Sequence, residues 1–364
     1  MVALGIPAGV LAHAAEVAAP FGVDAIEILT GRAALLGITP SGRVSAGGAT
    51  RLLAAADTWC ALTLSRSDDI DAVPALLGAD TVAADPWPVV TEWVARRSAA
   101  EAVERARLLG LPAAVLGETP PALPRRVSCG APSSPRDADG LLVVDLTSMW
   151  AGPLCGQLLA RRGATVVKVE STSRPDGTRQ GDVRFFDWMN TGKLCYTADF
   201  DQPQDLTELL SVADVVLEGS RPAALQQRGL GPRQIAGAPG RVWLRITGYG
   251  TAPDCVERVA FGDDAAVAGG LVLDGADGLE FAGDAIADPL TGLAAAVLVL
   301  ASLRAGGGEL IELAMAEVAA GYAALGGPLC TVGATAPDAC PRASELGADR
   351  QAVRQLIAQR GHRC

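Results

Sequence analysis

Few side chains in this 364-residue sequence have the types and spacing that common enzyme chemistries need. Histidine occurs only as His13 and His362, so the sequence offers very few side chains for a catalytic triad with histidine or for a metal site with several histidines. The 8 cysteines never approach CxxC spacing, which leaves neither a zinc pattern nor a disulfide framework. Lysine occurs only as Lys168 and Lys193 among 30 lysines and arginines, so both positions are notable. We therefore expect no metal.

One carboxylate is conspicuous because of its surroundings. Asp288 stands in GDAIADPLTGLAAAVLVLASL (residues 283–303), a small and apolar run that otherwise predicts a buried helix. Aspartate followed by proline is also the ordinary pattern of a helix N-cap with proline at the first helical position, so the dipeptide alone predicts a structural role. The two roles are compatible, since a helix N-terminus favours the ionised carboxylate that a nucleophile needs.

Charge and hydropathy argue against several classes of protein. A net charge of -11 disfavours a nucleic-acid partner. The first residues lack the basic region of a signal peptide, and the longest apolar stretch, residues 292–303, is shorter than the roughly 20 residues that span a bilayer. Scattered cysteines suit a reducing compartment. We expect a cytoplasmic protein with no membrane partner.

The turn at residues 145–157 argues against nicotinamide and flavin cofactors. It reads DLTSMWAGPLCGQ, whose glycines do not form GxGxxG, and Pro153 stands where that fingerprint needs close backbone approach to a pyrophosphate. Neither GxxxxGK[ST] nor GxSxG occurs, so P-loop and serine-hydrolase functions lose their best support.

The elements that must position Asp288 follow an alternating pattern. After a Pro-, Ser- and Gly-rich stretch, apolar runs typical of buried parallel strands alternate with helical patterns, which predicts βαβ units. Before it, two short strands around a turn at residues 56–57 and further helical patterns predict a small α+β unit. The fold class is therefore α/β, with an open Rossmann-like, mostly parallel sheet domain plus a small α+β domain. The expected organisation is a small domain at 1–127, a linker at 128–140, the sheet domain at 141–325 and a C-terminal segment at 326–364.

Several linked motifs resemble one family, the family III CoA-transferases, which include formyl-CoA and carnitine CoA-transferases and the α-methylacyl-CoA racemases. The motifs occur in the family's order over about residues 140–325 and read VVDLTSMWAGPLCGQLLARRGATVVKVE, PDGTR, NTGK, ADVVLEGSRPAALQQRGLG, RITGYG and IADPLTG. The first part of the chain resembles that family's small domain, which follows the sheet domain in most members. The domain order here thus looks circularly permuted, an arrangement that a fold with neighbouring surface termini tolerates.

The resemblance implies an acyl-CoA:carboxylate CoA-transferase. Asp288 falls at the family's nucleophilic aspartate, which attacks the acyl-CoA thioester and forms first a mixed anhydride and then an aspartyl-CoA thioester. Residues 141–325 are then the CoA-binding catalytic domain. The implied cofactor is coenzyme A, as the acyl-CoA substrate; the implied partners are acyl-CoA, a carboxylic acid acceptor and a second copy in a homodimer.

CoA contacts are expected at or just beyond strand ends, where open α/β sheets bind ligands. Cationic groups would hold the phosphoadenosine end, and small residues would allow backbone approach. The expected contacts are Trp150, Ala151, Arg174, Arg179, Lys193, Arg221 and Gly248. Each charged residue alone also fits a solvated side chain, and Ala151 and Gly248 also fit ordinary turns.

Alternatives remain open at this stage. Racemases of the family carry Gly-His-Asp where this sequence has Gly262, Asp263 and Asp264. Asp263 could replace that histidine as an acid or base only with a strongly raised pKa, and a solvated loop acid or another N-cap also explains it. Gly47 and Gly48 match a glycine loop that covers the active site in some members, or an ordinary turn. The other functions are therefore an acyl-CoA racemase or isomerase, and a catalytically silent CoA-binding subunit.

Overall fold

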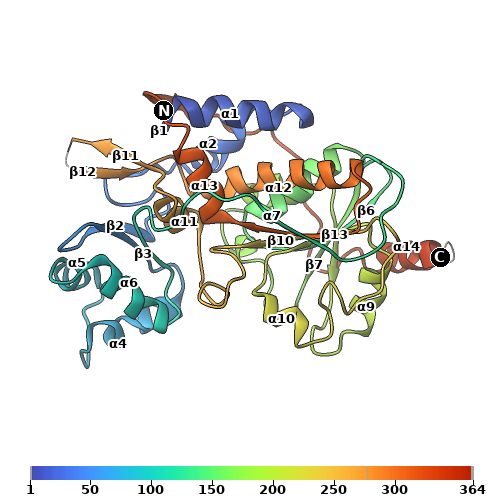
Figure 1. The fold of residues 1–364 in the computed structure, drawn as a ribbon, viewed down its shortest axis with the longest axis horizontal. Helices are drawn as coiled ribbons and strands as arrows, with labels where there is room; N and C mark the ends of the chain where they lie inside the picture. The colour runs from blue at the N-terminus through green and yellow to red at the C-terminus, as the bar shows by residue number, and fades with distance from the viewer. Residues whose placement is uncertain (1, 277, 362–364) are drawn as a thin grey trace.

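The computed structural model describes residues 2–276 and 278–361, and its centre is a seven-stranded sheet (Figure 1). Neighbouring strands run parallel except β5, which is antiparallel to β13. In spatial order the strands are β5 (Arg125–Ser128), β13 (Glu309–Ala314), β10 (Val242–Thr247), β9 (Val215–Glu218), β6 (Leu142–Leu146), β7 (Thr165–Glu170) and β8 (Leu194–Thr197). The expected open, mostly parallel sheet is confirmed.

Helices cover both faces of the sheet because its strands are apolar on both sides. Val143 belongs to one hydrophobic cluster, whereas Leu142 and Val144 belong to the other. One face carries α7 (Ala151–Arg161), α8 (Val183–Asn190), α12 (Ala287–Arg304) and α13 (Met315–Ala323). The opposite face carries α9 (Gln204–Ser211), α10 (Pro222–Gln226) and α14 (Arg350–Gly361).

The N-terminal elements pack on the α12 side of the sheet. Strand β1 (Ala3–Pro7) pairs antiparallel with β14 (Leu329–Gly333), and α1 (Ala8–Ala18), η1 (Ala19–Phe21) and α2 (Ala25–Leu36) follow. Their buried residues, such as Val10 and Leu29, share a cluster with Leu290 of α12, and α1 lies over α12 in Figure 1. The small domain was expected to include residues 1–36, yet α1 and α2 pack against α12, and β1 pairs with β14.

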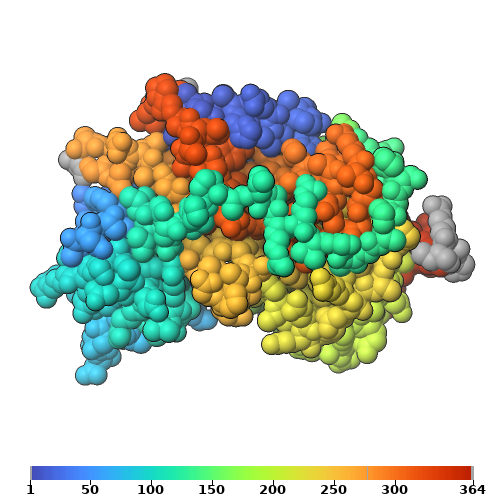
Figure 2. Space-filling view, viewed as in Figure 1, coloured from blue at the N-terminus to red at the C-terminus, as the bar shows by residue number. Residues whose placement is uncertain are grey.

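A separate small unit forms around a three-stranded antiparallel sheet. It contains β2 (Thr50–Ala54), β3 (Trp59–Thr63), β4 (Ala113–Val115), α3 (Ser67–Asp71), α4 (Val73–Leu77), α5 (Trp87–Ala95) and α6 (Ala99–Leu108), with a hydrophobic cluster of its own. The expected pair of short strands is confirmed by β2 and β3. The chain then crosses the front of the molecule, in teal to green in Figure 2, and β5 joins the large sheet.

The small unit contacts the elements that precede α12. These are α11 (Gly262–Ala268), β11 (Val272–Gly275) and β12 (Gly278–Phe281). The short helix η2 (Gly177–Gln180) instead follows β7 and contacts α8. Leu52 and Ala61 of the small unit form a cluster with Val267 of α11 and Phe281 of β12. The small unit therefore lies directly against the segment that leads into Asp288.

Two helical stretches are long and apolar enough to cross a membrane by composition alone. They are α12 and the bent pair formed by Ala8–Phe21 and Ala25–Leu36. Most of α12 is buried within the protein, where it packs against α7 and α13. This burial accounts for its apolar composition.

Candidate active site

Asp288 lies in the first turn of α12 rather than at its N-cap. The helix begins at Ala287, and the Asp288 N–H donates to the Ala285 carbonyl oxygen at 2.9 Å. The backbone N–H groups of Ala151 and Gly262 adjoin the Asp288 carboxylate and act to lower its pKa. The expected N-cap is wrong, because Ile286 takes that position and the Asp288 carboxylate faces the first residues of two other helices.

Three helices consequently begin at the same carboxylate. Ala151 is the first residue of α7, Gly262 is the first residue of α11, and Asp288 is the second residue of α12. N–H groups at helix starts lack intrahelical partners and favour negative charge nearby. A Cβ atom on Gly262 would overlap both the Asp288 Oδ2 atom and the Ala285 carbonyl oxygen, so the contact requires glycine.

Left-handed backbone occurs on both sides of this carboxylate. Among the described residues, Met149 (φ 72°) and Ala285 (φ 42°) are the non-glycine residues with positive φ. Met149 lies just before α7, and its N–H donates to Asp176 at 3.2 Å. Ala285 lies just before α12, and its N–H donates to Asp263 Oδ1 at 3.0 Å. Such conformations persist where surrounding contacts hold them, and they cluster at functional sites.

The carboxylates around Asp288 are held above their ordinary pKa values. Burial raises the pKa of Asp288 to about 7, with the positive charge of Arg32 opposing the shift and the charge of Asp263 adding to it. Burial likewise raises the pKa of Asp284 to about 6 and raises the pKa of Asp263. The Asp288 side chain is nevertheless partly exposed. At neutral pH it is thus divided between its protonated and its ionised form.

Arg32 of α2 is the basic group that reaches this cluster. Its Nη1 atom lies 2.7 Å from Asp284 Oδ1, across 252 positions of sequence. We name Arg32, Asp263, Asp284 and Asp288 the acidic site. Arg32 and Asp284 were not among the residues expected from the sequence. The signal that could have indicated Arg32 is a basic residue in a mostly apolar helical pattern.

Asp263 is not the solvated loop acid that its sequence context also allowed. It is the second residue of α11, is 9% exposed, and accepts the Thr50 hydroxyl at 3.4 Å. Its neighbour Asp264 accepts the Tyr249 hydroxyl at 2.9 Å, and burial raises the pKa of Asp264 to about 7. Both aspartates are buried because α11 packs against β3 and β4 of the small unit.

The Gly47–Gly48 turn lies beside Arg32. A Cβ atom on Gly47 would come within 3.2 Å of Arg32 Nη2, and Gly48 has a φ of +78°. The Gly48 N–H closes the turn by donating to the Ser45 carbonyl oxygen at 2.8 Å. The structure therefore brings this glycine turn to the acidic site.

Trp150 forms an aromatic wall beside the same guanidinium. The Arg32 Cζ atom lies 5.5 Å from the Trp150 ring centre and 5.8 Å from the Phe185 ring centre. The two rings meet edge to face at 5.3 Å. Trp150 is 3% exposed, and its Nε1 atom has no hydrogen-bond partner among residues 2–276 and 278–361.

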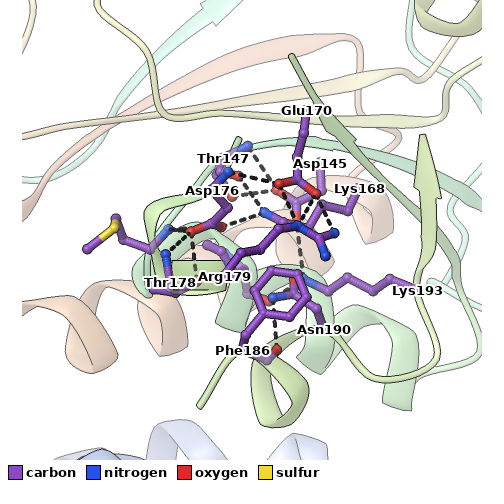
Figure 3. A network of polar contacts seen from close by, with 12 residues as sticks. Asp145, Thr147, Lys168, Glu170, Asp176, Thr178, Arg179, Phe186, Asn190 and Lys193 are labelled. Carbon is purple, nitrogen blue, oxygen red and sulfur yellow. Dashed lines mark hydrogen bonds and ion pairs between the residues drawn. The ribbon is translucent and has the colours of Figure 1, made fainter. Parts of the chain in front are cut away.

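Lys193 lies in a different environment, the buried polar network drawn in Figure 3. Its Nζ atom donates to Asp145 Oδ2 at 3.0 Å, to the Pro153 carbonyl oxygen at 2.8 Å and to Asn190 Oδ1 at 3.1 Å. An ammonium has three N–H donors, so these contacts saturate it. Its position does not support the expected contact with CoA.

The remaining network members are also paired. Lys168 Nζ lies 2.8 Å from Asp176 Oδ2 and donates to the Thr147 carbonyl oxygen at 2.9 Å. Arg179 forms a fork with Glu170, at 2.7 Å for its closest contact, and stacks 4.1 Å above the Phe186 ring. Arg179 is thus engaged within the protein too. We name the balanced network by its charged members, which are Asp145, Lys168, Glu170, Asp176, Arg179 and Lys193.

Charge balance keeps Asp145 and Asp176 of this network ionised. Burial opposes ionisation, yet Lys193 and Lys168 hold the pKa of Asp145 below its ordinary value. Lys168 does the same for the pKa of Asp176 against the effect of burial. Because Asp176 also accepts the Met149 N–H, the network fixes the turn that presents the Ala151 N–H to Asp288.

The other expected CoA contacts differ in exposure. Arg174 and Arg221 are exposed beyond β7 and β9, and Arg221 pairs with Glu257 at 3.1 Å. Gly248 follows β10, where an added Cβ atom would overlap Ala260. Close packing thus explains Gly248 by itself. The described part of the chain holds no group of three or more His, Cys, Asp or Glu residues that could hold a metal ion.

Known proteins share the part of the chain that carries these elements. The model of CoA-transferase family III matches residues 139–337. The chain is 30% identical over 202 residues to the succinyl-CoA–D-citramalate CoA-transferase of Chloroflexus aurantiacus, covering 50% of each protein. It is 35% identical over 130 residues to a formyl-CoA:oxalate CoA-transferase of Rhodopseudomonas palustris, covering 32% of this chain and 31% of that protein.

Among solved structures, a hypothetical protein from Mycobacterium tuberculosis is 31% identical with a TM-score of 0.48, covering 52% of this chain and 58% of that one. The chain spans about half the length of the first of these curated relatives and about a third of the second. The family match spans more than half of the sequence and includes β6, α7, α11 and Asp288. The chain therefore belongs to CoA-transferase family III.

Proposed function

We propose that this protein is an acyl-CoA:carboxylate CoA-transferase with Asp288 as its nucleophile. The observation that carries the proposal is the placement of one partly exposed carboxylate against the N–H groups of Ala151 and Gly262 at converging helix starts. Membership of the family and the names of the two curated relatives support the same reaction class. The substrates are acyl-CoA and a carboxylic acid, and coenzyme A is the group transferred.

The proposed reaction needs neither a metal nor a histidine. An Asp288 oxygen attacks the thioester carbon of acyl-CoA; a C–O bond forms, the C–S bond breaks, and CoA leaves as its thiolate. The thiolate then attacks the Asp288 carbonyl carbon of the anhydride. A C–S bond forms, the C–O bond breaks, and the first acid leaves as a carboxylate. The products of this half-reaction are the aspartyl-CoA thioester and the free acid.

The backbone donors around Asp288 have a defined role in these steps. The N–H groups of Ala151 and Gly262 orient the carboxylate before attack and stabilise negative charge on its oxygen when the thiolate adds to the Asp288 carbonyl carbon. Fixed donors of this kind need no reorganisation during the reaction. The rigid turns at Met149 and Ala285 keep them in place.

Covalent trapping tests the nucleophile. The protein is incubated with a panel of acyl-CoAs, treated with hydroxylamine or borohydride, and digested for mass spectrometry. We expect modification at Asp288, and the Asp288→Asn variant serves as the matched control because it keeps the size of the side chain. Modification at another residue, or none across a wide panel, would refute the proposal.

An acyl-CoA racemase or isomerase is the second candidate, and the environment of Asp263 favours it. Asp263 stands where racemases of the family carry histidine, and burial raises its pKa, as an acid-base role requires. Its charge also raises the pKa of Asp288, so the two groups interact. Exchange of the α-proton of an acyl-CoA in D2O without an acceptor acid would support this function; retention of the proton would eliminate it.

We further propose a permuted domain order and a cytoplasmic homodimer. The family match begins at residue 139, whereas the small unit lies before it, which supports the permuted order. Arg174 and Arg221 remain the proposed phosphate contacts because both are exposed beyond strand ends. Light scattering on the purified protein checks the dimer, and a monomeric mass at micromolar concentration would contradict it. The same preparation tests the silent-subunit alternative, which requires that it move no CoA between acids by itself.

A further inference from the structure

Arg32 is placed as a ligand-binding cation rather than as a simple structural one. Its Nη1 atom pairs with Asp284 at 2.7 Å, and its guanidinium adjoins the Trp150 and Phe185 rings. Gly47 borders its Nη2 side without a side chain. A guanidinium has five N–H donors, and the contact to Asp284 uses one of them. The Arg32 side chain is 22% exposed, so further donors are accessible.

Two buried polar atoms beside Arg32 lack protein partners. Asp284 is fully buried, and its Oδ2 atom has no hydrogen-bond partner in the described residues. The Trp150 Nε1 atom also has no hydrogen-bond partner among these residues. Buried polar groups in native proteins are nearly always satisfied, so the unpartnered donor Trp150 Nε1 beside the Asp288 carboxylate points to an acceptor on a ligand, whereas Asp284 Oδ2 is itself an acceptor and does not bind an anion.

The charge of the acidic site changes during the proposed reaction. Asp263, Asp284 and Asp288 all lie close enough to Arg32 for its charge to lower their pKa values. Once Asp288 is a thioester it carries no charge, and Arg32 loses one of its counter-charges. An acceptor acid reaches this state as an anion among carboxylates, so it needs a cation within the site.

We propose that Arg32 binds the carboxylate of the acceptor acid beside Asp288, with Asp284 fixing the guanidinium from the opposite side. This inference rests on the proposed CoA-transferase function. The bound carboxylate attacks the aspartyl-CoA carbonyl carbon; a C–O bond forms, the C–S bond breaks, and the CoA thiolate is released. The thiolate attacks the acceptor's own carbonyl carbon, which forms the new acyl-CoA and returns Asp288 as a carboxylate.

The test separates attack by an anion from attack by a neutral nucleophile. The aspartyl-CoA thioester is formed with the acyl-CoA that labels Asp288 fastest, and the unreacted acyl-CoA is then removed. The thioester is next allowed to react at pH 7.5 with one of two nucleophiles, the free acid of the same acyl group or hydroxylamine. Using the donor's own acid removes the need to know the natural acceptor. Mass spectrometry follows the loss of the thioester in each case.

Arg32→Gln should slow discharge by the acid roughly 10- to 100-fold, the loss expected for one charge-assisted hydrogen bond. Discharge by hydroxylamine should change less than about threefold, because a neutral nucleophile does not need the cation. Arg32→Lys keeps the charge and should restore part of the acid rate. The matched control is Arg350→Gln, because Arg350 also pairs with an aspartate, Asp205, at 2.8 Å and adjoins an aromatic ring, that of Tyr196.

The outcomes separate this inference from the function on which it rests. Equal slowing of both discharges by Arg32→Gln would overturn the role of Arg32 in acceptor binding while the covalent mechanism stands. If Arg32→Gln does not fold, Arg32→Lys and Asp284→Asn decide the matter, and unchanged acid discharge in both would also overturn it. Absence of any thioester at Asp288 in the unchanged protein would refute the CoA-transferase function itself.

Discussion

The acidic site and the balanced network are both buried clusters of charge, yet they differ in how the charges are matched. In the balanced network Lys168, Lys193 and Arg179 each have a carboxylate at 3.0 Å or less. In the acidic site, three carboxylates adjoin Arg32. The difference teaches that matched buried charges keep carboxylates ionised, whereas an unmatched cluster holds its carboxylates at raised pKa values.

The largest expected effect is on the acidic site. Asp288→Asn keeps the shape of the side chain but removes the attacking oxygen, so we expect CoA transfer to fall by about 10³-fold or more. Initial rates with the acyl-CoA that labels the unchanged protein provide the measurement. A variant that retains a tenth of the activity would show that the two clusters do not differ in chemistry as we infer.

The next largest effect is on the stability provided by the balanced network. Lys193→Met leaves Asp145 buried without its nearest cation, which should lower the free energy of unfolding by about 3–5 kcal/mol. Urea denaturation gives the value. Arg228→Gln is the control, since Arg228 pairs with the exposed Asp201 and should change stability by less than about 1 kcal/mol. Equal losses in both variants would remove the distinction between buried and surface pairing.

A change of pH should affect the two clusters in opposite directions. The raised pKa of Asp288, about 7, means that its contribution to stability is full below pH 4 and is lost as the pH rises through 7. The lowered pKa values of Asp145 and Asp176 contribute stability that is lost as the pH falls.

Asp288→Asn should therefore raise the free energy of unfolding at pH 8, by the order of 1 kcal/mol, with a smaller gain at pH 5 and none below pH 4. The rate of Asp288 labelling should meanwhile rise as the pH passes about 7, since the carboxylate is the nucleophile. Burial is the main cause of this raised pKa, and the charges of Arg32 of α2 and Asp263 of α11 modify it. A labelling rate that is flat between pH 5.5 and 8.5 would contradict the perturbed pKa.

The smallest effect concerns an exposed cation outside both clusters. Arg221→Gln should raise the KM for acyl-CoA by about threefold, because a solvated contact to the phosphate contributes little. The same variant should leave the KM for acyl-dephospho-CoA unchanged, which serves as the internal control. An equal rise with both substrates would place the adenosine phosphate elsewhere.

Much of the fold could be predicted from the sequence, and less of the site. Strands β6 and β7 were readable because strands buried on both faces give continuous apolar runs. The approach of Arg32 to Asp284 was not, because it joins positions 252 apart and no local pattern encodes such a contact. The burial of Lys193 could not be predicted for a related reason, since the rarity of a residue type shows nothing about whether it is buried. Asp288 was identified as a candidate through linked motifs. Its surroundings could not be predicted, because Ala151 and Gly262 come from distant parts of the sequence.

The packing of the N-terminal helices sets an order of events during synthesis. Arg32 is made early, but α2 packs against α12, and β1 pairs with β14. At about 5–20 residues per second, roughly 10–50 s separate α2 from the helix that covers it. The apolar faces of α1 and α2 stay uncovered over that interval, so a nascent chain needs protection there before its active site exists.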